Sequence, residues 1–135
     1  MHAQFHAKQN KSNLICIDKV GEGAGVWSRL GELYNDDPDM TIYGFDGRLS
    51  APEGIEHETY GNYKTYAWFK ASKKFRDHQA SIPKDPILIG QLSGVKFEFN
   101  SSGRIVIVAK DRIKKALKRS PDRADAYVMG LDALD

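Results

Sequence analysis

The stretch Leu14-Ile15-Cys16-Ile17-Asp18, followed by Gly21-Glu22-Gly23-Ala24-Gly25, decides how the rest of the chain is interpreted. Four consecutive apolar residues predict a short strand that is buried on both faces, because a half-exposed strand alternates apolar with polar residues. This strand ends on an acid. In open α/β sheets ligands bind outside the carboxyl ends of the strands, so Asp18 is the first candidate site residue.

The glycine-spaced segment predicts a loop that turns sharply and approaches a neighbour closely, because glycine adopts positive φ and has no Cβ. Gly21, Gly23 and Gly25 are therefore candidate loop residues. The dinucleotide fingerprint G-x-G-x-x-G fails in both registers, and Asp18 and Glu22 would repel a pyrophosphate. A metal cation suits this acidic loop better.

Apolar residues then recur at helical spacing, which predicts a helix directly after the loop. They are Val26, Trp27, Leu30, Leu33 and Tyr34. A second strand at 40–45 would return parallel to the first. Beyond it the patterns predict a loop at 46–61, a helix at 62–79, a short helix at 86–92, a hairpin of 95–99 with 104–108, a basic helix at 110–117 and a last helix from 120. The predicted class is α/β.

Length and composition predict one domain over residues 1–135. A single cysteine excludes a disulfide framework and a cysteine metal cage. The sequence contains no apolar run of membrane-spanning length and no signal-peptide pattern, so we expect a cytoplasmic protein without a membrane partner.

The net charge of +2 does not by itself indicate a nucleic-acid partner, but basic residues gather in 61–80 and 110–123. Two basic helix faces on a near-neutral chain are typical of a phosphate-backbone contact, and two solvated helix faces explain the charges equally well. The candidate DNA-binding residues are Lys73, Lys74, Lys110, Lys114 and Arg123.

Two acids open the last predicted helix. Ser120-Pro121-Asp122 is a helix start, in which serine caps, proline takes the first helical position and the acid favours the positive end of the helix dipole. Asp125 shares a face with Asp122, because residues three apart are neighbours on a helix. Helix stabilisation alone explains Asp122, whereas Asp125 flanks the apolar side of the helix and is the stronger candidate ligand.

These acidic segments resemble a known family. Ile17-Asp18-Lys19-Val20-Gly21-Glu22-Gly23-Ala24-Gly25-Val26 and Ser120-Pro121-Asp122-Arg123-Ala124-Asp125-Ala126 are similar to the second and last acidic motifs of the nuclease domain of bacteriophage large terminase subunits. Gly103-Arg104-Ile105 running into Lys110-Asp111 resembles the hairpin and basic segment before the last motif. The resemblance implies an incomplete ribonuclease H-like fold, with short parallel strands, a β-hairpin and flanking helices.

The resemblance also implies a function: a metal-dependent endonuclease that cuts concatemeric viral DNA during genome packaging in the bacterial host cytoplasm. Asp18, Asp122 and Asp125 would hold Mg²⁺ or Mn²⁺, since clustered carboxylates suit these ions, and two ions about 4 Å apart activate water and stabilise the leaving oxygen. Implied partners are double-stranded DNA, the terminase ATPase domain, the small terminase subunit and the portal.

The chain departs from the family pattern at its start. The family places three strands first, one of them with a further metal-binding Asp, and an ATPase domain before those; no strand is predicted before Leu14, and no G-x-x-x-x-G-K-[ST] motif occurs. We therefore expect a domain truncated on its N-terminal side: a fragment, a separately encoded piece or a prophage remnant. It would cut DNA weakly alone and form a homodimer through its unpaired strand edge. A non-catalytic DNA-binding module and a junction resolvase are the alternative interpretations.

Overall fold

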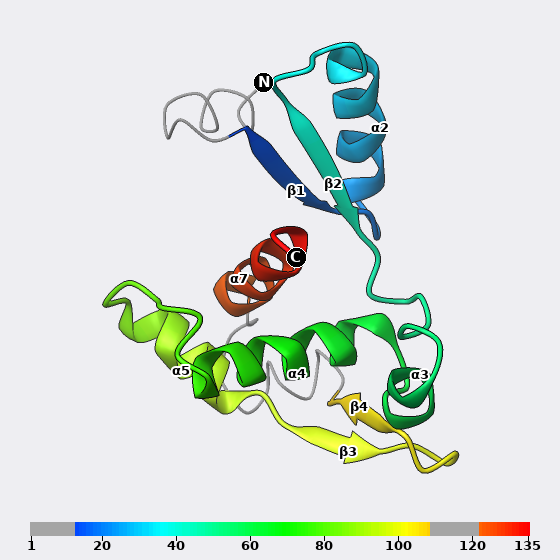
Figure 1. The fold of residues 1–135 in the computed structure, drawn as a ribbon, viewed down its shortest axis with the longest axis vertical. Helices are drawn as coiled ribbons and strands as arrows, with labels where there is room; N and C mark the ends of the chain where they lie inside the picture. The colour runs from blue at the N-terminus through cyan, green and yellow to red at the C-terminus, as the bar shows by residue number, and fades with distance from the viewer. Residues whose placement is uncertain (1–12, 109–121) are drawn as a thin grey trace. The chain divides into compact units, whose positions relative to one another are not determined.

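The computed structural model describes residues 13–108 and 122–135 (Figure 1). The chain divides into two compact units, Met1–Asp46 and Gly47–Asp135, and each is described by itself. The predicted basic helix at 110–117, with Lys110 and Lys114, lies outside the described residues, as does the Ser120-Pro121 cap.

The first unit is a β-α-β arrangement of β1 (Leu14–Asp18), α2 (Gly23–Tyr34) and β2 (Thr41–Phe45) (Figure 1). The two strands pair in parallel, from Leu14 opposite Thr41 to Asp18 opposite Phe45. The predicted parallel return of the chain is confirmed, and its consequence is that Asp18 closes the carboxyl end of β1 beside the end of β2.

The core of the first unit centres on Ile15 of β1 and Leu30 of α2, which are 7% and 0% exposed. The partly buried residues packed against this pair are Ile17, Tyr34, Met40 and Ile42. The prediction that β1 is buried on both faces is wrong: Ile15 alone is buried, because one described strand and one helix cover β1. Val26 and Leu33 are also exposed, so the apolar face of α2 is narrower than its pattern predicts.

The second unit contains four described helices: α3 (Ile55–Thr59), α4 (Tyr63–Arg76), α5 (Pro86–Gly94) and α7 (Asp122–Ala133). The prediction of a loop over 46–61 is wrong, since α3 lies within it. This helix is too short to show periodicity in the sequence, and Gly54, with φ of 101°, leads into it. The Asn62 side chain caps α4 by accepting a hydrogen bond from Thr65 N at 2.9 Å.

A hairpin of β3 (Phe97–Phe99) and β4 (Ile105–Ile107) pairs antiparallel as predicted. Gly103 supplies the positive φ of 77° that its turn requires. The hairpin is joined to α4 by the hydroxyl of Thr65, which is fully buried and accepts a hydrogen bond from Ile107 N at 3.0 Å. Gly61 permits close approach at the same place, because an added Cβ would lie 2.4 Å from Val106 Cγ1.

Helix α7 packs against both α4 and α5 (Figure 1). The face of α7 that is buried there consists of Ala124, Val128 and Asp132, four residues apart each time. A buried acid in this series requires partners: Asp132 accepts hydrogen bonds from the Tyr63 hydroxyl at 3.0 and 3.1 Å and from the Lys70 ammonium at 2.5 Å. The α4–α7 contact is therefore an ion pair embedded in a small apolar core.

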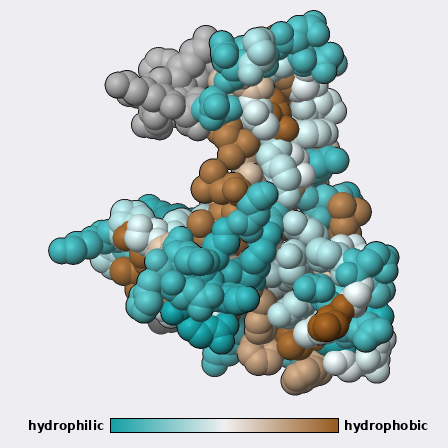
Figure 2. All heavy atoms as spheres, viewed as in Figure 1, coloured by the Kyte–Doolittle hydropathy of each residue, from teal (hydrophilic) through white to brown (hydrophobic). Residues whose placement is uncertain are grey.

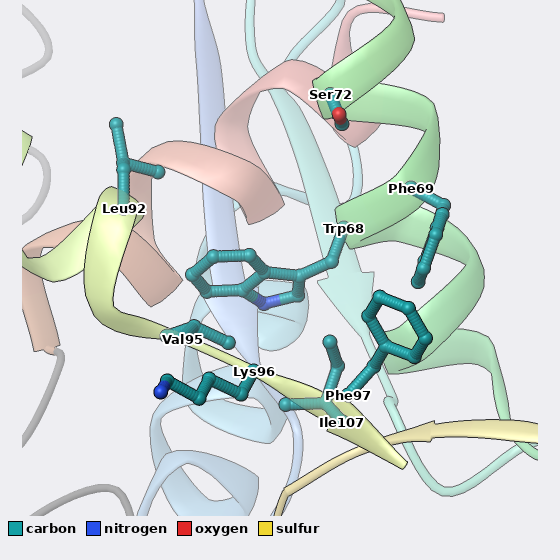
Figure 3. Close-up of a pocket in the computed structure, with 8 residues that line it drawn as sticks. All are labelled: Trp68, Phe69, Ser72, Leu92, Val95, Lys96, Phe97 and Ile107. Carbon is teal, nitrogen blue, oxygen red and sulfur yellow. The ribbon is translucent and has the colours of Figure 1, made fainter. Parts of the chain in front are cut away.

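The surface of the described part is mostly hydrophilic in the view of Figure 2, with hydrophobic residues in separate patches. Phe97 and Phe99, on one face of β3, are 53% and 67% exposed. Phe97 lines a hollow of about 200 Å³ beside α4, the end of α5 and the hairpin. In Figure 3 the rings of Phe69 and Phe97 meet edge to face, with centroids 5.4 Å apart, and Trp68 lies beside them.

Candidate metal centre

Asp18 lies at the end of β1, as predicted, and its side chain is exposed. One carboxylate oxygen, Oδ1, accepts a hydrogen bond from Val20 N at 2.9 Å, so Asp18 also organises the turn that leads to α2. A turn-forming role and a ligand role are compatible, because an ionised carboxylate has about four lone-pair positions for donors or metals.

The glycines after Asp18 have three different environments. Gly21 has φ of 66° and makes the turn. The predicted loop is shorter than expected, because α2 already begins at Gly23. An added Cβ at Gly23 would lie 1.8 Å from the backbone oxygen of Asp18, whereas nothing lies within 4 Å of such an atom at Gly25. Gly23 thus allows the first turn of α2 to contact the end of β1.

Asp122 and Asp125 lie in the first turn of α7, in the second unit. Asp122 is exposed. The Asp125 side chain is 16% exposed, and the Lys64 ammonium of α4 lies 3.6 Å from Asp125 Oδ1. The expectation that Asp125 flanks the apolar side of its helix is confirmed, and Lys64 is a neighbour that the sequence did not indicate.

Helix α5 holds the start of α7 through two contacts. The buried Gln91 accepts a hydrogen bond from Ala124 N with its Oε1 at 3.1 Å, which satisfies one of the free N–H groups of a helix start. The Arg123 guanidinium lies 2.8 Å from Asp85 Oδ2. Asp85 caps α5 by accepting from Ile87 N and Leu88 N, and the bond from Leu88 N, together with Arg123, lowers the pKa of the Asp85 carboxyl.

The predicted DNA-binding residues differ in their surroundings. Lys73 is exposed on α4. Lys74 forms an ion pair with Asp135, and Arg123 forms one with Asp85, so DNA would have to share or replace these partners. Their contact with DNA stays a prediction.

Asp122 and Asp125 offer oxygen donors one helical turn apart, the ligand type that hard divalent cations prefer, but the Lys64 ammonium would compete with a cation at Asp125. Over residues 13–108 and 122–135, no three His, Cys, Asp or Glu side chains gather closely enough to hold a metal ion. Asp18 belongs to the first unit and the α7 acids to the second. Their joint binding of metal stays a prediction.

The two units together define the class: a ribonuclease H-like α/β fold, in which β1 of a parallel β-α-β unit ends on an acid and the last described helix begins with two carboxylates. Solved structures of a viral protein have a similar fold. A mutant nuclease domain of the large terminase subunit gp2 of bacterial virus Sf6, with manganese and beta-thujaplicinol, matches with a TM-score of 0.72 and 18% identity over 95% of this chain and 68% of that chain.

Two further structures of gp2 of Sf6 match in the same way. The nuclease domain without a stated mutation has a TM-score of 0.69 at 18% identity, and a mutant with calcium has 0.70 at 19% identity; each covers 95% of this chain and 68% of its own. No protein-family model and no curated protein sequence matches the chain. The expected fold is confirmed: the chain has the fold of a phage terminase nuclease domain. None of the helices described here is both long and apolar enough to cross a bilayer.

Proposed function

We propose that this chain is the nuclease module of a phage terminase, a metal-dependent endodeoxyribonuclease that cuts concatemeric viral DNA during packaging. The observation that supports it most is the pairing of this fold with Asp122 and Asp125 at the start of α7, where Asp125 is mostly buried beside Lys64. The structural neighbours bound to manganese and to calcium support a divalent cation, Mg²⁺ or Mn²⁺.

In this proposal Asp18, Asp122 and Asp125 hold the metal, which when bound supplies Lewis-acid activation of water and stabilisation of the leaving oxygen. The lysine at position 64 lies 3.6 Å from Asp125 Oδ1 and limits the rotation of that side chain. Gln91 and Asp85 fix the backbone from which both α7 acids project. The residues of the chain thus preorganise carboxylates, and positioning is a large part of catalysis in a phosphodiester hydrolase.

The proposed substrate and partners follow from the same assignment to a phage terminase. The substrate is double-stranded DNA in the host cytoplasm, and the partners are a terminase ATPase domain, a small terminase subunit and a portal. Alone, the chain cuts weakly, because among the described residues no three His, Cys, Asp or Glu side chains gather closely enough to hold a metal ion. A homodimer of this chain belongs to the proposal as well.

Metal binding is the direct test. Isothermal titration of the purified chain with Mn²⁺ should show binding that falls about tenfold or more in Asp125→Asn, since even indirect partners of a metal ligand are worth 10–100-fold in affinity. Asp36→Asn, an exposed acid in the first unit, is the matched control and should bind as the unmodified chain does. Equal affinity in Asp125→Asn would refute the metal centre.

Cleavage is tested with supercoiled plasmid and Mn²⁺. We expect slow nicking that Asp18→Asn and Asp125→Asn abolish. Fast nicking by the lone chain would contradict the expectation of weak cutting, and a strong preference for branched over linear duplex would instead favour a junction resolvase.

A further inference from the structure

The second unit carries a hollow of about 330 Å³ on the side of α4 that faces α3. Its lining is unusual in combining rings with cations: Tyr60, Tyr66, Phe69, Lys70, Lys73 and Arg76. The volume falls within the range of about 300–1,000 Å³ in which small-molecule sites lie. A hollow of this size holds one nucleotide.

The side chains of α4 that line the hollow occupy one face of the helix. At about 100° per residue, positions 66, 69, 70, 73 and 76 fall within about a third of its circumference. The buried Ala67 and Ala71 lie on the opposite side. Helix α4 therefore packs partly through small residues and presents its large aromatic and basic residues on a face that is not buried.

The rings form an angled wall. The centroid of Tyr60 lies 5.2 Å from that of Phe69 and 6.0 Å from that of Tyr66, with interplanar angles of 37° and 54°. All three residues are half-buried. Ring surface consequently remains at the hollow, where a planar base can stack, and stacking on such a surface tolerates any base.

The three cations at the hollow differ in whether they already form ion pairs. Lys70 is held by Asp132 and Asp135 and lies 5.1 Å from the centre of the Tyr66 ring, so its charge is largely compensated. Lys73 and Arg76 are exposed, and neither takes part in the ion pairs recorded between described residues. These two can bind a phosphate, Arg76 with a planar fork of donors.

One acid shares the site. Glu56 of α3 also lines the hollow and is exposed. Its carboxylate opposes a ligand that is only an anion, but it can accept hydrogen bonds from the amino group of a base. The lining therefore favours a nucleotide, with base and phosphate together, over free phosphate.

We propose that this hollow binds one unpaired nucleotide of single-stranded DNA, with its base against Tyr60, Tyr66 and Phe69 and its phosphate at Lys73 and Arg76. A base inside a duplex is stacked and paired and cannot present its face to these rings. The site goes beyond the proposed function, which needs duplex DNA only, and its binding step requires no metal.

The position of the hollow gives this site a use. Lys64, beside Asp125, and Lys73, at the hollow, are nine residues apart on α4, which corresponds to about 13 Å along the helix axis and to half a turn around it. In the proposed function, a strand that frays or is released at the α7 carboxylates would therefore have to pass around α4 to reach the hollow. The site would thus retain a cut or melted strand on the side of α4 opposite to Lys64.

The proposed nucleotide site is tested by fluorescence anisotropy at low salt. The probe is a labelled, mixed-sequence single strand of about ten nucleotides. EDTA is present throughout, so that failure of the metal centre cannot affect the result. We expect single-stranded binding that is stronger than binding of the matching duplex. Tyr66→Leu should weaken it by about 5-fold to 150-fold, the range for losing one stacked base, and Arg76→Gln by several-fold.

Two control variants keep the inference falsifiable. Lys96→Gln removes an exposed lysine of the same unit that lines the other hollow, and Phe99→Leu removes an exposed ring of the hairpin. Both should bind as the unmodified chain does, and circular dichroism should show each variant folded. Equal losses in Arg76→Gln and Lys96→Gln, equal binding of duplex, or displacement of the oligonucleotide by inorganic phosphate alone would each overturn the nucleotide site.

Discussion

Replacing Lys70 by methionine should destabilise the second unit strongly, because it leaves a charge buried without its main partner. Asp132 is 1% exposed at its side chain and lies 2.5 Å from the Lys70 ammonium, which is 22% exposed. Removing one partner of a buried ion pair costs about 3–5 kcal/mol, and the lower end applies here, because the Tyr63 hydroxyl still donates to Asp132. We expect a loss of about 3 kcal/mol in the free energy of unfolding.

The measurement needs a probe confined to the second unit. The chain has two tryptophans, so Trp27→Phe leaves Trp68 of α4 as the only one. With a urea m-value of about 2 kcal/mol per M, the midpoint of unfolding followed by Trp68 fluorescence should fall by about 1.5 M. Lys73→Met, which removes an exposed lysine one turn along, should leave the midpoint nearly unchanged.

A double variant separates a buried charge from lost packing. In Lys70→Met with Asp132→Leu both members of the buried pair are removed, and replacing a buried pair by apolar residues of similar size is often neutral. We expect most of the lost stability to return. A double variant as unstable as the single one, or a Lys70→Met midpoint equal to that of Lys73→Met, would show that Asp132 is not held as a buried charge.

Three shorter predictions concern the start of α2, the start of α7 and the response to pH. Gly23→Ala should destabilise the first unit by about 1–3 kcal/mol, because the added Cβ meets the backbone oxygen of Asp18. Gly25→Ala should stabilise the same unit by about 0.5–1 kcal/mol, because nothing lies within 4 Å of its added Cβ. Urea unfolding followed by Trp27 fluorescence distinguishes the two variants. Gln91→Leu should cost about 1–3 kcal/mol, since it leaves a buried N–H of α7 without an acceptor, and should weaken Mn²⁺ binding with it. The hydrogen bond from Lys74 lowers the pKa of the Asp135 carboxyl, so this contact stabilises the fold above the ordinary value of 3.8 and loses its effect as the pH falls through the lowered value. The urea midpoint of unfolding should therefore stay constant from about pH 5 to 9 and fall below about pH 4. In Asp135→Asn the fall below about pH 4 should be smaller.

At alkaline pH the pKa shift of Lys70, which contacts the same Asp135, acts in the opposite direction: it stabilises the fold at lower pH and not at higher pH. Burial lowers the pKa of the Lys70 ammonium, but its hydrogen bonds to Asp132 and Asp135 outweigh burial and raise the pKa above the ordinary value of 10.5. A raised pKa contributes stability below 10.5 that is lost as the pH rises through the folded-state value. The Lys70 side of this contact therefore stays charged across the neutral range.

Local sequence patterns were sufficient to predict those elements that are determined by neighbouring residues. The parallel pairing of the first two strands followed from their spacing, and the hairpin followed from alternation around Asn100-Ser101-Ser102-Gly103. The start of α5 followed from Pro86. The same patterns missed α3, because five residues are too few to show a period. They overstated the burial of β1, because four apolar residues in a row do not say how many layers cover them.

Of the residues at the candidate site, the sequence likewise predicts those marked by local features and misses those that depend on distant contacts. Asp18, Asp122 and Asp125 were selected by their positions at a strand end and a helix start, which are local features. Lys64 and Gln91 were missed, since their roles depend on contacts with residues 61 and 33 positions away. One signal was available for the buried Asp132: it continues the four-residue series of Ala124 and Val128, and an acid in such a series requires a cation from another element.

The acids of α7 depend on residues outside their own motif. Near its start, α7 is tied to α5 by Gln91 and by the Asp85–Arg123 pair, and near its end it is tied to α4 by Lys70 and Lys74. A helix fixed at both ends is hindered from rotating to redirect its carboxylates, so a metal ion at the proposed site would meet them already oriented. A chain with the same S-P-D-R-A-D-A segment but an apolar residue at position 91 would retain the acids and lose their placement. If the proposed metal centre forms, its affinity should therefore depend on α4 and α5 as much as on the acidic motif itself.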